Sequence, residues 1–424
     1  CMDKSMLAEV NLITTEPLIS VGLILPEDKK SSILIEDTSI KKKYKIKVKS
    51  GQIVINKKIA KNPFIFKSKS KEDTFIIKKI KAGRGFHWEK DITINVTGEL
   101  ILKSNDQNLI LINKLKLEDY IASVATSEMS NSCPSSFLES QTIAARSWVL
   151  ASAENKHEDL NVDVCNDDCC QRYQGVKELN ESAISSANKT RGYILTSNSK
   201  ICDTRYSKSC GGISENNEVV WFNKPIEYLR AVHDSKTNAI PRLMSEQELN
   251  TWIDNPDSCF CDETEISKKE LKSYLGHVDK MGSYFRWSYS LKQQELCVLI
   301  RKKAGHHFDS IVSLVPISRG VSGRINLLKI KGYTKSKPST IKIKSEYEIR
   351  RVLHPKFLYS SAFIIIANSS SNRPPDKFTF KGAGWGHGVG LCQIGALNMA
   401  LKGYSHKQIL YHYFLNSKLK RLYE

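Results

Sequence analysis

The sequence has no long apolar run and none of the motifs that are typical of nucleic-acid-binding domains. Its longest apolar runs, such as Leu18–Leu25 and Ala362–Ala367, are far shorter than the roughly 20 residues that a membrane helix needs. No helix-turn-helix, RNA-recognition or zinc-finger spacing occurs, and the lysines are scattered, so we expect no nucleic acid partner despite the formal net charge of +19. Attraction to anionic polymers or membrane surfaces, or solvation alone, accounts for this charge.

Internal repeats and low-complexity tracts are also absent, which favours ordinary globular domains. The 424 residues suffice for two or more domains, and 40% hydrophobic with 26% charged residues is usual for a folded chain. Between Pro17 and about Ile112 the chain has short, β-branched, partly alternating segments, whereas the remainder mixes helical and strand patterns without a regular βαβ repeat. We therefore predict an α+β fold, with a β-rich N-terminal module (residues 1–112), a mixed α+β region (residues 113–424) and an insertion at about 242–281.

The first residue is Cys1 rather than Met, and the sequence contains no signal peptide. A processed lipoprotein begins with a cysteine that carries a lipid. One interpretation is therefore membrane attachment through a lipid on Cys1; the other is that the sequence merely starts at this residue.

The stretch Leu115–Lys156 is predicted to form two helices around a break at residues 131–134. Glu128 lies at the end of the first helix. Pro134 suits the first turn of the second helix, where its missing N–H would be unpaired anyway, and apolar residues three or four apart give that helix one buried stripe. Arg146 is a permanent charge within this apolar run. Taken alone, Glu128 fits a solvated helix end and Arg146 fits a salt-bridge partner.

Four blocks of residues occur in an order that resembles the stage II sporulation protein D family, also called the amidase-enhancer family. They are Tyr120 with Glu128-Met129 and Ala144-Ala145-Arg146, then Cys165–Gly175, Tyr206–Trp221 and Gly384–Ala396. The resemblance extends over about Leu115–Phe414 and leaves the insertion unmatched. It implies an exported protein of the cell envelope or periplasm that binds peptidoglycan glycan strands. The family's second name suggests a cell-wall amidase as a further partner.

By this resemblance, residues 113–424 form a catalytic region with a groove, and the protein is a lytic transglycosylase. Such an enzyme cleaves glycan strands between N-acetylmuramic acid and N-acetylglucosamine and leaves 1,6-anhydromuramic ends, with Glu128 as the general acid and base. Glu128 then has to start protonated, which requires dry, apolar surroundings such as Val124, Ala125 and Met129 can provide. The alternative, from a different class, is a non-catalytic peptidoglycan-binding protein that stimulates a partner amidase.

Arg146 is expected to lie far from Glu128. It follows Pro134 by about twelve residues, or roughly 18 Å of helix, so a plain antiparallel hairpin would not place it beside Glu128. Two roles stay open for Arg146: it orients substrate elsewhere in the groove, or it braces its helix.

The glycine-rich segment Gly382–Gly390 lacks the Lys-Ser/Thr pair of a phosphate-binding loop. Its glycines allow positive φ angles or close approach of a ligand. The family resemblance makes this segment part of the catalytic groove and gives substrate-binding roles to His387, Gln393 and Tyr206. A purely structural His387 is the alternative.

Eleven cysteines, three of them within residues 165–170, indicate metal or disulfide chemistry. Thiolates and imidazoles bind Zn²⁺ tetrahedrally, and four such ligands make a closed structural site. Some family members are similar in carrying a His, a Cys and a His-Cys pair here. That resemblance assigns structural zinc to His157, Cys165, Cys169 and Cys170, with Cys169 in place of the paired histidine. Disulfides to Cys202 or Cys210 are the competing interpretation.

Overall fold

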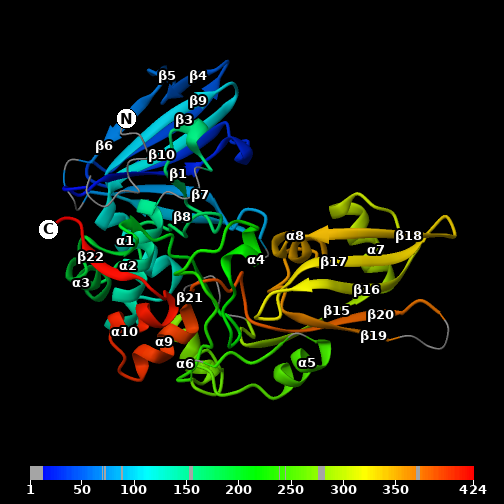
Figure 1. Ribbon diagram of the computed structural model, residues 1–424. Helices are drawn as coiled ribbons and strands as arrows, with labels where there is room; N and C mark the ends of the chain where they lie inside the picture. The colour runs from blue at the N-terminus through cyan, green and yellow to red at the C-terminus, as the bar shows by residue number, and fades with distance from the viewer. Residues whose placement is uncertain are drawn as a thin grey trace. The chain divides into compact units, whose positions relative to one another are not determined.

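The computed structural model (Figure 1) describes residues 13–68, 70, 73–86, 89–151, 156–237, 239–243, 245–275, 282–368 and 373–424. The chain divides into two compact units: Cys1–Asp203 with Lys272–Lys280 and Lys418–Glu424, and Thr204–Leu271 with Met281–Ser417. Both contain helices and strands, which confirms the α+β class. In the part of the chain that is described, no helix combines the length and the apolar character needed to cross a bilayer. Cys1, the expected lipid site, lies outside the described residues.

Two larger sheets dominate the first unit, with strand orders β11-β1-β10-β9-β6 and β5-β4-β3-β2-β7-β8. Their strands are β1 (Leu18–Ile24), β2 (Ser32–Asp37), β3 (Lys42–Lys49), β4 (Gln52–Ile55), β5 (Lys58–Ile59), β6 (Phe64–Lys67), β7 (Phe75–Ala82), β8 (Lys90–Val96), β9 (Glu99–Asn105), β10 (Asn108–Lys116) and β11 (Val164–Cys165). Residues that alternate along a strand, such as Phe75 and Ile77, point into one shared core. Strand β10 continues to Lys116, so the β-rich part leads directly into the first helix.

The predicted helix pair follows in the same unit. Its elements are α1 (Leu117–Glu128), α2 (Ser135–Ala151), the short 3-10 helix η3 (Glu158–Leu160), α3 (Glu181–Lys189), and the small sheet β13 (Lys200–Ile201), β12 (Tyr193–Ser197) and β22 (Lys418–Arg421). In Figure 1, α1, α2 and α3 lie together next to β22. Tyr120, Ile121 and Val124 of α1 join the core of the two larger sheets. The helix that ends in Glu128 is thus anchored by apolar packing.

The second unit contains three smaller sheets, with orders β14-β21, β15-β20-β19 and β16-β17-β18. Its strands are β14 (Tyr206–Ser207), β15 (Arg286–Lys292), β16 (Ser310–Arg319), β17 (Ile325–Thr334), β18 (Lys337–Lys344), β19 (Phe363–Asn368), β20 (Lys377–Ala383) and β21 (Leu391–Cys392). The helices here are α4 (Asn217–Trp221), α5 (Glu246–Asp254), α7 (Gln293–Ala304), α8 (Glu346–Val352), α9 (Gln393–Leu401) and α10 (His406–Tyr413). Helix α6 (Lys268–Tyr274) begins in this unit, and its residues from Lys272 onward are assigned to the first unit. Helices α5 and α6 lie within residues 242–281, the predicted insertion.

Candidate active site and metal cluster

Glu128 occupies the last position of α1, and only 8% of it is exposed. Its Oε1 atom accepts the backbone N–H of Arg172 at 3.1 Å. Burial opposes the charged form of a carboxyl group, whereas an N–H donated to it favours that form. The position of the Arg172 backbone therefore determines one hydrogen bond of the Glu128 carboxyl group.

That backbone belongs to residues 165–175, here called the cysteine loop, which is hydrogen-bonded to α1 over several turns. The bonds are Gln174 N–H to Ser127 Oγ (3.0 Å), Ser123 Oγ–H to the Gly175 carbonyl (2.5 Å) and Tyr120 Oη–H to Gln171 Oε1 (2.9 Å). Gly175 has a φ of +75°, and a Cβ atom there would lie 2.1 Å from the Asn95 carbonyl oxygen. Only glycine permits this close approach. The loop thus fixes the amide that contacts Glu128.

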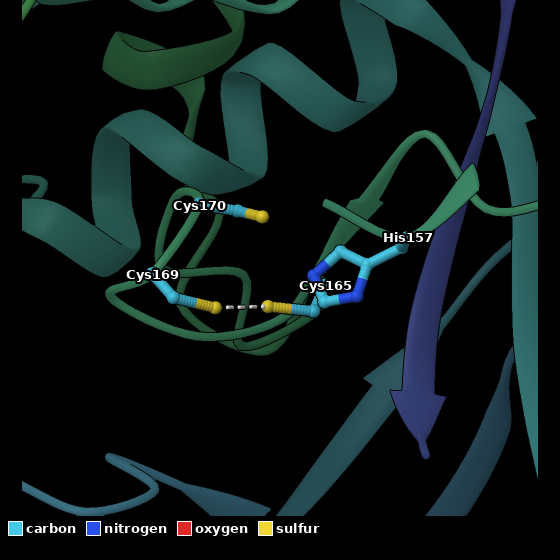
Figure 2. Close-up of side chains that lie close together, drawn as sticks. All are labelled: His157, Cys165, Cys169 and Cys170. Atoms are coloured by element: carbon cyan, nitrogen blue, oxygen red, sulfur yellow. Dashed lines mark hydrogen bonds between the residues drawn. The ribbon is translucent and has the colours of Figure 1, made fainter. Parts of the chain in front are cut away.

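The cysteine loop and the residues before it also bring the four predicted metal ligands together. One ligand atom from each of His157, Cys165, Cys169 and Cys170 lies within 4.8 Å of the other three. The sulfur atoms of Cys165 and Cys169 face each other at 3.0 Å, as Figure 2 shows. Strand β11 positions Cys165 by pairing in parallel with β1, where Gly22 is opposite Cys165. Residues separated by up to 13 positions in sequence therefore form one cluster.

The chemistry of this cluster fits a metal ion. His157 Nε2 is buried and has no hydrogen-bond partner among the described residues. Hydrogen bonds from the thiols of Cys165 and Cys169 lower the pKa of Cys170 to about 4, which favours its thiolate. All three cysteines carry free thiols in the structure. Three sulfur ligands and one imidazole make a closed structural set for zinc.

Arg146 is completely buried and contacts Glu118 rather than Glu128. Its Nε and Nη2 atoms donate to the two carboxylate oxygens of Glu118 at 2.9 and 2.6 Å, and Nη1 donates to the Tyr193 carbonyl at 2.9 Å. Because α1 and α2 run antiparallel, the last turns of α2 lie opposite the first turn of α1, as the helix length predicts. These contacts favour the bracing role over contact with substrate.

The three predicted substrate-binding residues all lie in the second unit. Tyr206 in β14 pairs with Leu391 in β21, and Gln393 opens α9 and is 1% exposed. The glycines at 384, 386, 388 and 390 all have positive φ angles, as expected for this segment. A Cβ atom at Gly388 would lie 2.2 Å from Cζ of Arg324. In the described structure this glycine therefore serves close packing within the unit.

The surroundings of His387 oppose a positive charge on its ring. Its Nδ1 atom accepts the Val389 N–H at 3.0 Å, and its ring lies 5.1 Å from that of Trp221. Burial, reinforced by the guanidinium groups of Arg205, Arg350 and Arg324, places the pKa of His387 well below its usual value. A ring fixed in this way is consistent with the structural alternative, and a sugar contact stays a prediction.

Two parts of the chain match known protein families, and two curated proteins are similar to it in sequence. Residues 105–197 match the family model described as Stage II sporulation protein, and residues 215–390 match a domain of unknown function (DUF8618). An uncharacterised protein of Brachyspira hyodysenteriae (strain ATCC 49526 / WA1) is 26% identical over 337 residues, which are 79% of this chain and 75% of that protein. The amidase enhancer of Bacillus subtilis (strain 168) is 26% identical over 309 residues, 70% of this chain and 39% of the relative.

The first family match contains Glu128, Arg146 and the whole cysteine loop. The later blocks, Tyr206–Trp221 and Gly384–Ala396, lie outside it, and the predicted insertion falls within the domain of unknown function. Residues 105–197 therefore carry a domain that matches the stage II sporulation protein family, which confirms the resemblance found in the sequence.

Proposed function

We propose that this protein is a lytic transglycosylase of the cell envelope, with Glu128 as its general acid and base. The observation that carries the proposal is a buried carboxylate at the end of α1, inside the family match, that accepts a backbone N–H from the cysteine loop. The name of the Bacillus subtilis relative, an amidase enhancer, supports a role at the cell wall. Export and a groove that admits a glycan strand belong to the same proposal.

A single carboxylate is enough for this reaction. The proton of Glu128 passes to the glycosidic oxygen as the bond from that oxygen to the anomeric carbon of muramic acid breaks. The 6-hydroxyl of the same muramic acid attacks the anomeric carbon, and its proton goes to Glu128, which is thereby restored. No water is consumed, and the products are a 1,6-anhydro end and a free 4-hydroxyl. This route differs from hydrolysis by two carboxylates, where water is the acceptor.

We assign a structural zinc ion to His157, Cys165, Cys169 and Cys170. A closed set of four protein ligands leaves no open position for chemistry, so the ion would supply folding free energy and hold the cysteine loop. Within this proposal, Arg172 N–H positions Glu128, and Arg146 stabilises the helix pair. Tyr206, Gln393 and His387 are retained as candidate contacts for the glycan.

The name of the Bacillus subtilis relative favours a second candidate function, stimulation of a cell-wall amidase by a non-catalytic binding protein. Glu128→Gln separates the two. Under the first proposal the variant folds and retains glycan strands in a pull-down but releases no products. Under the second, added protein raises amidase activity equally with and without the substitution. Glu181→Gln, an exposed carboxylate at the start of α3, is the matched control and should behave as the wild type in both assays.

A further inference from the structure

A second cluster of ligand-type side chains lies inside the second unit. Cys210, Asp234, Cys261 and Cys392 are each at most 2% exposed, and one ligand atom from each lies within 4.8 Å of the other three. They come from four separate segments: the residues after β14, the loop between α4 and α5, the loop before α6, and strand β21. Tertiary folding therefore brings four buried ligand atoms together from segments that are far apart in the sequence.

The spacing of these atoms matches one tetrahedral metal ion. Bonds of about 2.3 Å from zinc to sulfur and about 2.0 Å from zinc to oxygen give tetrahedral edges of about 3.8 Å between two sulfurs and about 3.5 Å between sulfur and oxygen. The Sγ atoms of Cys210 and Cys261 are 3.7 Å apart, and Cys210 Sγ is 3.5 Å from Asp234 Oδ2. A disulfide requires sulfur atoms at about 2.05 Å. These two distances are those expected of ligands around a shared metal ion.

The carboxylate of Asp234 is oriented toward the thiols by its other contacts. Its Oδ1 atom accepts the Tyr413 O–H at 2.6 Å and lies 3.7 Å from His412 Nε2, whereas Oδ2 accepts the Cys261 N–H at 3.1 Å. Outer partners that fix a ligating carboxylate are usual around metal sites. A Cβ atom at Gly395 would lie 2.4 Å from both Asp234 Oδ2 and Tyr413 Oη. Glycine at this position therefore leaves the space that the carboxylate occupies.

Neighbouring donors and cations suit an anionic ligand set. The backbone N–H of Cys210 donates to Cys392 Sγ at 3.2 Å. Arg324 Nη2 donates to the Cys210 carbonyl at 3.2 Å, and Arg286 Nη1 donates to the Gly211 carbonyl at 2.9 Å. Three thiolates and a carboxylate carry more negative charge than one divalent cation neutralises, and two guanidinium groups this near offset the excess.

We propose that Cys210 Sγ, Cys261 Sγ, Cys392 Sγ and Asp234 Oδ2 bind a structural zinc ion. Asp234 and Cys261 lie within the domain of unknown function at residues 215–390, whereas Cys210 and Cys392 lie just outside its two ends. The ion joins that domain to the segments that enter and leave it. This assignment is independent of the reaction proposed for Glu128.

The test measures zinc in the 424-residue chain by elemental analysis, followed by the visible spectrum after replacement with Co²⁺. Cys165→Ser removes the first cluster and leaves the second intact. Wild-type protein should contain about two zinc ions per chain and Cys165→Ser about one. Cys165→Ser loaded with Co²⁺ should show the intense sulfur-to-cobalt charge-transfer band of a tetrahedral site with several thiolates. Adding Cys261→Ser to that variant should remove the remaining ion and the band, and Asp234→Asn should shift the band and weaken metal retention.

Cys297→Ser in α7, a half-buried cysteine of the same unit outside the cluster, is the matched control and should retain the metal content of its parent. If Cys261→Ser fails to fold, the spectrum of Cys165→Ser and the Asp234→Asn shift still decide the matter. A Cys165→Ser protein without zinc and without a cobalt band would overturn the proposal. So would peptide mapping that finds two of the three cysteines joined in a disulfide.

Discussion

The contact between Arg146 and Glu118 gives the most quantitative prediction. Arg146→Met removes the cation and keeps an apolar side chain of similar length. Removing one partner of a buried, hydrogen-bonded ion pair costs about 3–5 kcal/mol, because the other charge stays buried without compensation. Glu118 would retain the Gly192 N–H at 3.2 Å and the Tyr423 O–H at 2.7 Å. We therefore expect a loss at the lower end of that range, about 3 kcal/mol.

A loss of that size is large against the usual free energy of unfolding of about 5–15 kcal/mol. For a domain of 150–250 residues, about 2–4 °C per kcal/mol predicts a fall in the melting temperature of roughly 6–12 °C. Arg191→Met is the matched control. Arg191 pairs with Glu16 at the same distance of 2.6 Å, but 31% of its side chain is exposed, so its loss should cost less than about 1 kcal/mol.

Urea denaturation of the two variants measures both costs. Adding Glu118→Gln to Arg146→Met should recover part of the lost stability, because no unpaired carboxylate is then left buried. Any surviving folded Arg146→Met should cleave glycan at a rate close to that of the wild type. A variant with wild-type stability and no cleavage would refute the bracing role and would indicate that Arg146 orients the substrate.

Three further predictions concern the loop, the glycine and the histidine. Cys165→Ser should release about one zinc ion per chain, measured by elemental analysis, and lower the melting temperature, measured by calorimetry. The rate in a cleavage assay should fall only to the extent that Arg172 N–H moves away from Glu128. Gly175→Ala should lower cleavage while zinc content stays unchanged, because the new Cβ has to displace the Asn95 carbonyl; normal cleavage would contradict the role given to the loop. The lowered pKa of His387 means that the unfolded chain binds its proton first. Stability should therefore be unaffected by this group above about pH 6.5 and fall below that pH by at most about 1.4 kcal/mol per pH unit. Denaturation between pH 5 and 8 should show a shallower decline in His387→Gln, and an equal decline would contradict the assignment.

Local patterns were sufficient to predict much of the fold. Residue spacing located α1 and α2, because helical periodicity, the break at residues 131–134 and the start signal of Pro134 coincide there. Within the predicted β-rich module, the sequence did not locate individual strands such as β7 and β10. Their short apolar runs, Phe75–Ile77 and Leu109–Ile112, fit a buried helix segment as well as a strand, and only pairing with distant neighbours separates the two.

The two metal clusters and the Glu128 contact differ in how much of each could be predicted from the sequence. The family resemblance assigned His157, Cys165, Cys169 and Cys170 to one site, and the structure brings these four residues together. The contact between Arg172 and Glu128 was not predictable, because it depends on a backbone amide and therefore on no particular side chain. The second cluster joins residues from 210 to 392 and includes Asp234, which no local motif singles out. Such an assembly is determined by tertiary packing.

The most direct test of the central claim is digestion of purified glycan strands in water enriched in ¹⁸O, followed by mass spectrometry of the new ends. Attack by the 6-hydroxyl predicts anhydromuramic ends that contain no ¹⁸O, formed by wild-type protein and by Glu181→Gln but not by Glu128→Gln. Reducing ends that carry ¹⁸O, or product formation that persists in Glu128→Gln, would contradict the account.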